Sequence, residues 1–532
     1  MNKLFLYWHT VRYMKPGQVY YRIRKMLKLK STLGIQPAPM PKKEQLRPIA
    51  TMPELDNDPV FLKRFPTEEL LEGKLTFLYE SEQFDGDGKW EFPNRTSLWN
   101  INLHYFEFLF SLTAKYRETN DARYLEAVKA YISCWIAHNP QSAGGPGWDA
   151  YAVSLRLVNW LGCYTALREE LEKDATFVQS VVGSMYEQYA FLANRLEKDL
   201  LGNHYFEDLK TLVICSVFFH DDKMFWPALR ELKKQCQEQI FLDGMHFELS
   251  PMYHKIILED VLRVAVVLKD AGRSDPELEG YLQPMLDVAY SLEEGLERIP
   301  LFNDCGNNVA KSLQALMDAA FNHFGLVPQY KPRLPDSGYY IFKQGQWKLI
   351  VDAGQPGPPY IPGHAHCDAM SFELFRAGKP VLVNCGTYAY QCADRLVYKN
   401  TAAHNTVMRK GIEQSQCWGS FRMAKRASVR AKKVDDTSIT MEMRDQQGGI
   451  VCRSIVMEPD RLCIQDTSKN QPLQAYLHHA PLESERKLIA DSGTIQRIGS
   501  MSYAPDYGKK YLIDTFLLEG FQKLRYWVSL ED

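Results

Sequence analysis

The sequence lacks the features of disulfide-stabilised, membrane-spanning and nucleic-acid-binding proteins. Its 11 cysteines are odd in number and scattered, and no CxxC pair occurs. Such usage is typical of reduced, buried thiols rather than of a disulfide framework. No stretch is long and apolar enough to span a bilayer. A formal net charge of −2 provides no general basic field for a polyanion, so any acidic ligand must be held by a local cluster of groups.

The N-terminus also lacks a recognisable secretory signal. The apolar run from Leu4 to Trp8 is interrupted by His9, Thr10 and Arg12, which is too early for the hydrophobic region of such a signal. Together with the cysteine usage, this pattern leads us to expect a cytoplasmic protein with free thiols.

Length and composition indicate a large globular protein of several domains. The chain has 532 residues, of which 45% are hydrophobic and 24% are charged, and these values are ordinary for a globular protein. Domains of roughly 100–200 residues predict two to four of them. We predict an N-terminal helical and linker segment at residues 1–60, a helical domain at 61–330 and a strand-rich domain at 335–532.

Apolar residues recur at helical spacing from about residue 98 to residue 325. Breaks containing Gly or Pro separate several of these segments, which predicts an array of helices joined by short loops. After about Pro335, short segments rich in β-formers are separated by turns, which predicts an antiparallel β-sandwich. We expect a cleft where the two domains meet. The predicted helices cover residues 104–115, 124–137, 151–168, 176–196, 204–219 and 255–270.

Two clusters of polar residues lie next to predicted helices. In GNHYFE, Asn203 is a candidate N-cap, and His204 and Glu207 share a helix face because they are three residues apart. In DGMHFELSPMYH, several ionisable groups and Tyr253 crowd a loop before a helix, a place where bulky side chains often line a site. The alternatives are a capped helix with a satisfied histidine and a turn with a packed tyrosine.

A third cluster, GHAHCD, opens a predicted strand at residues 370–375. A His-x-His pair in a strand points both imidazoles, here those of His364 and His366, to the same face. Two such rings suit a metal site or a proton-transfer pair. Asn384 and His404, further along the chain, can complete a metal shell of nitrogen and oxygen ligands. The alternative is a coincidence of packed or exposed histidines.

Taken in order, these segments resemble those of the heparinase II/III family. The likeness covers roughly residues 95–425, and six short segments in the family's order make a specific signal. It implies a multidomain α+β fold in which an incomplete (α/α) toroid precedes an antiparallel β-sandwich. It also implies a polysaccharide lyase that cleaves a uronic-acid-containing glycan by β-elimination. The segments are NLHYFEFL, WDAYAVSLRLVNWL, NHYFEDLK, DGMHFELSPMYH, HAHCDAMSFEL with VLVNCGTYAY, and RLVYKNTAAHNTV with GSFR.

The resemblance also implies roles for individual residues. Tyr253 and His364 match the family's catalytic tyrosine and histidine. Asn203, His204 and Glu207 match the positions that engage the uronate carboxyl group. The same segments supply the substrate-binding residues that we predict, which are Trp148, Tyr151, Arg156, His246 and Glu248.

His366, Asn384 and His404 match the family's metal-site positions. We therefore expect one structural divalent ion, zinc rather than calcium, and no organic cofactor. The middle position is usually Asp in the family, whereas Asn384 offers a neutral and weaker oxygen ligand. A reduced affinity for the metal is the expected consequence.

The chemistry of β-elimination explains why such residues are needed. The C5 proton of a uronate can leave only after the charge of its carboxylate is relieved by strong hydrogen bonds or a protonated partner. Asn203 can donate through its amide, and Glu207 can donate if burial keeps it neutral. A base then takes the proton and an acid protonates the leaving O4. Tyr253 can perform both tasks, while His364 is the base for the opposite C5 epimer or activates Tyr253.

Two other functions stay open at this stage. The lack of a signal peptide favours trimming or modification of a nascent surface polysaccharide inside the cell, since degradative family members are usually exported. A glycan-binding protein without activity is the third possibility, although binding alone needs neither Tyr253 nor His364. The expected partner is an acidic polysaccharide and not a nucleic acid. The sequence leaves open the identity and sulfation of the uronate, the cutting mode and the oligomeric state.

Overall fold

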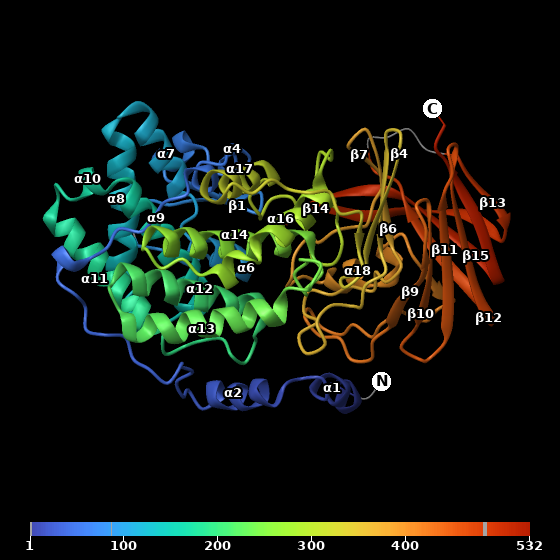
Figure 1. The fold of residues 1–532 in the computed structure, drawn as a ribbon, viewed down its shortest axis with the longest axis horizontal. Helices are drawn as coiled ribbons and strands as arrows, with labels where there is room; N and C mark the ends of the chain where they lie inside the picture. Colours follow the sequence, from blue (N-terminus) through green and yellow to red (C-terminus); the bar gives the residue numbers. More distant parts are fainter. Residues whose placement is uncertain (1–2, 87, 482–486, 532) are drawn as a thin grey trace.

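The computed structural model describes residues 3–86, 88–481 and 487–531. A helical domain and a domain of antiparallel sheets lie side by side (Figure 1), as predicted. The change from helices to strands falls between Phe324 and Arg333, next to the predicted domain boundary. A short antiparallel hairpin, β1 (Lys74–Phe77) with β2 (Glu80–Gln83), lies within the helical domain and was not predicted.

The helices of the first domain follow the predicted segments closely. Each of the six predicted helices is present, with ends shifted by a few residues. The main helices are α6 (Ser97–Leu103), α7 (Leu109–Thr119), α8 (Ala122–His138), α9 (Ala150–Ala166), α11 (Ala175–Leu192), α12 (Gly202–Phe218), α13 (Asp222–Gln239), α14 (Pro251–Asp270), α16 (Leu282–Glu293) and α17 (Leu313–Phe324); shorter ones are α3 (Pro53–Asp56), α4 (Pro59–Leu62), α5 (Thr67–Leu71), α10 (Arg168–Leu171) and α15 (Pro276–Glu279).

Helix α12 lies at the centre of the helical domain. It packs against α9, α13 and α14, and every one of its residues is buried except His204. A helix enclosed in this way must bury polar groups in pairs, because an unpaired buried charge is costly. The one partly exposed residue of α12, His204, faces a cavity rather than the outer surface.

The second domain consists of two antiparallel sheets packed face to face. One sheet has the order β3-β4-β5-β6-β7, and the other has β13-β15-β12-β11-β10-β9 with β14 beside β15 and β8 beside β12. Alternate residues of strands such as β11 are buried in a core shared by both sheets, which is the pattern expected of a sandwich. The strands are β3 (Arg333–Leu334), β4 (Tyr339–Gln344), β5 (Trp347–Asp352), β6 (Phe372–Arg376), β7 (Lys379–Leu382), β8 (Val407–Arg409), β9 (Ser428–Val434), β10 (Ser438–Arg444), β11 (Ile450–Met457), β12 (Arg461–His478), β13 (Leu488–Ser492), β14 (Thr494–Asp506) and β15 (Lys509–Ser529), with the short helix α18 (Arg395–Lys399) between β7 and β8.

The N-terminal segment bridges the two domains. Helices α1 (Lys3–Val11) and α2 (Pro16–Met26) run one after the other along one edge of the molecule (Figure 1). Trp418 of the sandwich domain donates a hydrogen bond from Nε1 to Oγ1 of Thr10 at 3.1 Å. Gln18 donates from Nε2 to the carbonyl of Leu200 in the helical domain, also at 3.1 Å.

All 11 cysteines are free thiols in the structure, as predicted. Within the described ranges, no helix has both the length and the apolar character needed to cross a membrane.

Candidate active site

A cavity of about 790 Å³ lies where the two domains meet, as expected from the sequence. Its walls come from the helical domain, from loops of the sandwich domain and from α1 and α2. The predicted residues on its wall are Tyr151, Asn203, His204, Glu207, Tyr253 and His364.

Tyr253 and His364 meet in this cavity although they are more than a hundred residues apart in the chain. Tyr253 lies in the first turn of α14, where Ser250 caps the helix by accepting a hydrogen bond from the Tyr253 amide at 3.3 Å. The ring centroids of Tyr253 and His364 are 4.2 Å apart. The Tyr253 hydroxyl lies 2.6 Å from that of Tyr390. Burial and this neighbouring hydroxyl raise the pKa of Tyr253 well above its ordinary value.

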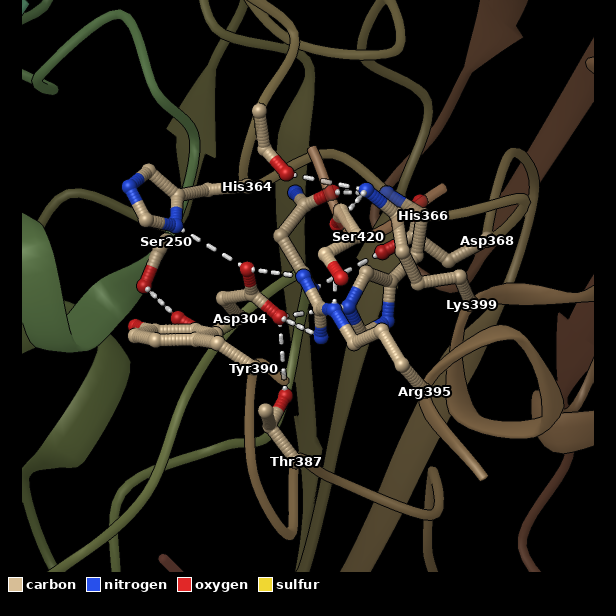
Figure 2. Close-up of polar contacts among 12 residues, drawn as sticks. Ser250, Asp304, His364, His366, Asp368, Thr387, Tyr390, Arg395, Lys399 and Ser420 are labelled. Atoms are coloured by element: carbon tan, nitrogen blue, oxygen red, sulfur yellow. Dashed lines mark hydrogen bonds and ion pairs between the residues drawn. The ribbon is translucent and has the colours of Figure 1, made fainter. Parts of the chain in front are cut away.

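Asp304 orients the side chain of His364. The Nδ1 atom of His364 lies 2.9 Å from Oδ2 of Asp304, and Arg395 donates to both carboxylate oxygens of Asp304 at 2.5 Å (Figure 2). Although burial opposes ionisation, Arg395 and the histidines hold the pKa of Asp304 well below its usual range. A fixed carboxylate beside Nδ1 favours the tautomer with the proton on Nδ1, which leaves the lone pair of the ring on Nε2.

The two histidines of the His-x-His motif do not share a face, contrary to prediction. Residues 364–370 form a loop, and the strand β6 begins only at Phe372. His364 lines the cavity, whereas His366 is buried behind it and places Nε2 at 2.8 Å from Oδ1 of Asp304. The strand geometry fails because the motif lies in a loop, and the two rings contact different oxygens of Asp304.

His204 carries a positive charge at the cavity wall. Its Nδ1 lies 3.0 Å from Oε2 of the buried Glu197. Burial alone would lower the pKa of His204, but the Glu197 carboxylate outweighs it and raises the pKa to about 9. The ring of Tyr151 lies 4.6 Å away, centroid to centroid. An imidazolium in this position suits a carboxylate ligand.

Asn203 is held by Glu248 rather than capping its helix. The N-cap of α12 is Leu201, at a φ of 66°, and Asn203 lies in the first turn. The Asn203 amide nitrogen donates to both oxygens of Glu248, at 3.0 and 2.9 Å. Glu248 thus fixes the orientation of the Asn203 side chain and is itself buried away from the cavity wall.

Glu207 forms a buried network with two other charged residues. Its carboxylate forms an ion pair with Lys210, and Lys210 also donates to Asp260 at 2.6 Å. The sequence pointed to Glu207 as a neutral donor, whereas the structure places it in an ion pair. Burial, followed by the charge of Glu207, raises the pKa of Asp260 well above its usual range.

Three predicted substrate-binding residues are structural instead. Trp148 packs against Trp135 and donates from Nε1 to a backbone carbonyl. Arg156 is fully buried, and its guanidinium donates to Gln188 and to two backbone carbonyls. His246 is also fully buried and contacts Gln239 at 3.1 Å. None of the three lies on the cavity wall, because the helical core needs these polar and aromatic groups to satisfy its own backbone.

The predicted metal ligands converge in part. Nδ1 of His366 lies 3.1 Å from Nε2 of His404, and both residues are buried. The buried Asn384 accepts a hydrogen bond from the backbone amide of Asn405, next to His404, at 3.1 Å. Within the part of the chain that the structure describes, no group of three or more His, Cys, Asp or Glu side chains could hold a metal.

Several residues of the site were not identified from the sequence. Asp304 lies in the polar run NDCGNN between apolar segments, a pattern that was available but was given no role. Tyr390 and Arg395 lie within segments that carried the family resemblance, and Tyr507 lies well beyond them, yet spacing alone could not place any of the three beside Tyr253. The hydroxyls of Tyr390 and Tyr507 are 2.8 Å apart and extend the chain of hydroxyls from Tyr253.

A buried cation also lines the cavity. Lys311 is 4% exposed, and its ammonium lies 3.2 Å from the centroid of the Phe61 ring. It donates no hydrogen bond to any residue that the structure describes. Arg64 packs over the same ring and pairs with Glu107 at 3.1 Å. Burial lowers the pKa of Lys311 to about 8, so an anionic ligand in the cavity would stabilise its charge.

Comparison with known proteins identifies relatives over nearly the whole chain. The family model for the heparinase II/III N-terminus matches residues 20–330, and the model for the heparinase II/III-like C-terminal region matches residues 327–498. The chain is 22% identical over 341 residues to the heparin-sulfate lyase of Pedobacter heparinus, covering 57% of this chain and 51% of that protein. It is 23% identical over 404 residues to the heparin-sulfate lyase of Bacteroides thetaiotaomicron, covering 65% and 56%. The chain thus spans about half the length of these curated relatives.

A solved structure supports the fold assignment. The crystal structure of heparinase III superimposes with a TM-score of 0.67 and 15% identity, covering 96% of this chain and 88% of that one. This likeness confirms the predicted architecture of an incomplete (α/α) toroid followed by a β-sandwich.

Proposed function

Because the chain belongs to the heparinase II/III family, we propose that it is a polysaccharide lyase that cleaves a uronic-acid-containing glycan by β-elimination. One observation carries the proposal: Tyr253, His364 and the charged His204 line one cavity. These three side chains offer a proton acceptor, a proton donor and a group that neutralises a carboxylate, which together are what the elimination requires.

In the proposed reaction, His204 receives the uronate carboxylate. Its imidazolium, held by Glu197, relieves the negative charge that would otherwise make the C5 proton too weak an acid to remove. Asn203, fixed by Glu248, lies one residue away on the same helix and can add an amide donor to the same carboxylate. Charge relief of this kind lowers the barrier because it is strongest when a second negative charge develops on the carboxyl group.

Proton transfer then completes the elimination. A base takes the C5 proton, the C4–O4 bond breaks, a C4–C5 double bond forms, and O4 leaves with a proton from the acid. Nε2 of His364 is the base, because Asp304 holds the proton of this ring on Nδ1. Tyr253 is the acid, because its raised pKa keeps the hydroxyl protonated.

The proposed substrate is an acidic polysaccharide. Lys311 supports this choice, because a buried ammonium without a hydrogen-bond acceptor is costly until an anion reaches it. Arg22 and Lys25 on α2 and Arg422 and Arg426 in the sandwich domain line other parts of the cavity. A chain with acidic groups on several sugars would thus meet cations at both ends of the site.

We also propose that His366 and His404 hold a divalent ion, zinc rather than calcium. Nδ1 of His404 lies 3.0 Å from the carbonyl of Asn400, and Nε2 of His366 faces Asp304. If Nδ1 of His404 and Nε2 of His366 carry the protons, the lone pairs of the other two ring nitrogens face each other. The contacts of the two protonated nitrogens are then those that metal-bound histidines usually make. Asn384 would add an oxygen ligand. Once bound, the ion would fix the loop that carries His364.

The direct test is incubation of the purified protein with a panel of uronate polymers that differ in sugar and sulfation. Unsaturated uronate absorbs in the ultraviolet, so growth of this absorbance establishes both the reaction and the substrate. The His364→Ala variant provides the blank. Binding of a polymer without any absorbance change would favour a glycan-binding protein.

A further inference from the structure

Helices α1 and α2 expose apolar residues on their outer faces. Leu4, Trp8 and Val11 of α1 are 75%, 68% and 45% exposed and follow the spacing i, i+4, i+7. Val19, Ile23 and Met26 repeat this spacing on α2 with 36%, 52% and 78% exposure. Residues at this spacing lie on one face of a helix. Each helix therefore carries an outward apolar ridge, and these six residues are named the N-terminal ridges.

The opposite faces attach both helices to the protein. Leu6 and Gln18 are buried, Gln18 donates to the carbonyl of Leu200, and Thr10 accepts a hydrogen bond from Trp418. Lys15 forms an ion pair with Glu238. Hydrogen bonds, an ion pair and ring contacts such as that between Tyr7 and Trp418 therefore hold the inner side of the segment in place, while the N-terminal ridges are exposed on the other side. Apolar side chains in such a position indicate an external partner.

The charge of the segment indicates what that partner is. Residues 3–30 contain eight Lys and Arg residues and no Asp or Glu, whereas the rest of the chain has 55 Lys and Arg against 65 Asp and Glu. A basic helix with Trp, Leu and Ile on one face is the pattern of helices that lie in the interface of an anionic bilayer. A second copy of the chain is disfavoured as the partner, because two strongly basic segments would repel each other.

We propose that α1 and α2 bind the protein to the surface of an anionic lipid bilayer. The N-terminal ridges enter the headgroup region, and basic residues such as Lys28 and Lys30, which are exposed, contact the lipid charges. The inner side of the same segment lines the cavity through Thr10, Gln18 and Arg22. A protein bound in this way would hold its cavity beside the membrane, where it can reach glycans attached to that surface.

Vesicle flotation tests this proposal independently of any lyase activity. The full-length protein is mixed with phosphatidylcholine vesicles containing about one-third phosphatidylglycerol, or with phosphatidylcholine vesicles alone. We expect the protein to float with the anionic vesicles at low salt and to float much less with the neutral vesicles. High salt should weaken the binding, because it screens the basic residues.

The variant Trp8→Ser, Ile23→Ser, Met26→Ser should lose at least tenfold in vesicle binding. The matched control is Trp226→Ser, Leu242→Ser, Phe321→Ser, which removes three exposed apolar residues of the helical domain outside this segment and should bind like the wild type. Replacing Lys28 by Gln should weaken binding by up to about fivefold, the contribution of one basic residue near a charged bilayer. Thermal melting of each variant confirms that it is folded.

Two results would overturn the proposal. One is absence of wild-type binding to anionic vesicles at low salt, and the other is equal binding by the ridge variant. Light scattering of the free protein distinguishes membrane binding from dimer formation. If the wild type is a dimer that binds no vesicles, and the ridge substitutions convert it to a monomer, the ridges form a contact between two copies instead.

Discussion

Nδ1 of His364 lies 2.9 Å from Oδ2 of Asp304, whose other oxygen contacts His366 at 2.8 Å. One buried carboxylate thus orients the histidine that faces the cavity and the histidine that faces the candidate metal site. Arg395 holds this carboxylate in turn through both of its oxygens. The structure therefore links the base of the proposed reaction to the buried histidine pair through a single side chain.

Replacing His364 by Ala should lower kcat by about 10²–10⁴-fold, the usual contribution of a positioned general base, on polymers whose C5 proton faces it. KM should change little, because proton transfer belongs to the transition state. Steady-state kinetics on the polymer identified by absorbance measures this effect. The control is His138→Ala, which removes a histidine of α8 that is absent from the cavity wall. Full activity of His364→Ala would remove it from the reaction.

Glu197→Gln should change the pH dependence of activity. In the wild type, Glu197 raises the pKa of His204 to about 9, so activity should decline only as the pH rises through about 9. Without the carboxylate, the pKa of His204 should fall, because burial is then opposed only by the charges of Asp149 and Asp208. The decline in activity should therefore begin at a lower pH than in the wild type, and activity at pH 8 should drop. An unchanged alkaline limb would contradict the role of His204.

The same pair should stabilise the fold in a pH-dependent way. The pKa of His204 is higher in the folded protein than in the unfolded chain, so its contribution is fully present below about pH 6.5. The contribution is lost as the pH rises through about 9. Glu197→Gln should therefore destabilise the protein near neutral pH and much less above pH 9, which denaturant unfolding at several pH values can measure.

Lys311→Met should raise KM for an acidic polymer by about tenfold, the value of one charge-assisted hydrogen bond. The change in kcat should be small, because this cation contacts a sugar away from the reacting bond. Methionine keeps the contact with Phe61 and removes a buried charge, so the fold should be at least as stable. An unchanged KM for the acidic polymer would show that Lys311 does not contact the substrate.

Metal analysis tests the proposed ion. Protein purified without chelator should contain up to one zinc per chain, and His366→Ala should contain far less. The matched control is again His138→Ala, which should retain the wild-type content. Equal metal content in the wild type and in His366→Ala would remove His366 from the site.

Much of the fold could be predicted because its signals are local. Helical periodicity located α7, α8, α9, α11, α12 and α14, and strand-like segments located β4 to β7 and β9 to β12. The shift from one pattern to the other lies beside the change from helices to strands in the structure. The helix face shared by His204 and Glu207 was also correct, since it depends only on the spacing within α12. Family motifs then identified Tyr253 and His364, which local patterns alone could not connect.

The remaining features depend on contacts between distant segments. Glu207 pairs with Lys210 and Asp260, and only the packing of α12 against α14 reveals this network. Arg156 was predicted to bind substrate because it lies in a segment that resembles the family. Its actual partners are backbone carbonyls brought near by other loops. Asp304 was missed for the same reason, since its partners lie 60 to 91 residues further along the chain.

The proposed β-elimination is tested most directly by cleaving the polymer in water enriched with oxygen-18. Elimination breaks the C4–O4 bond without adding water, so mass spectrometry should find an unsaturated uronate at the new non-reducing end and no heavy oxygen at the site of cleavage. Tyr253→Phe, which retains the ring and loses the hydroxyl, should form none of this product while still binding the polymer. Saturated products that carry the heavy oxygen, or full turnover by Tyr253→Phe, would contradict the proposed function.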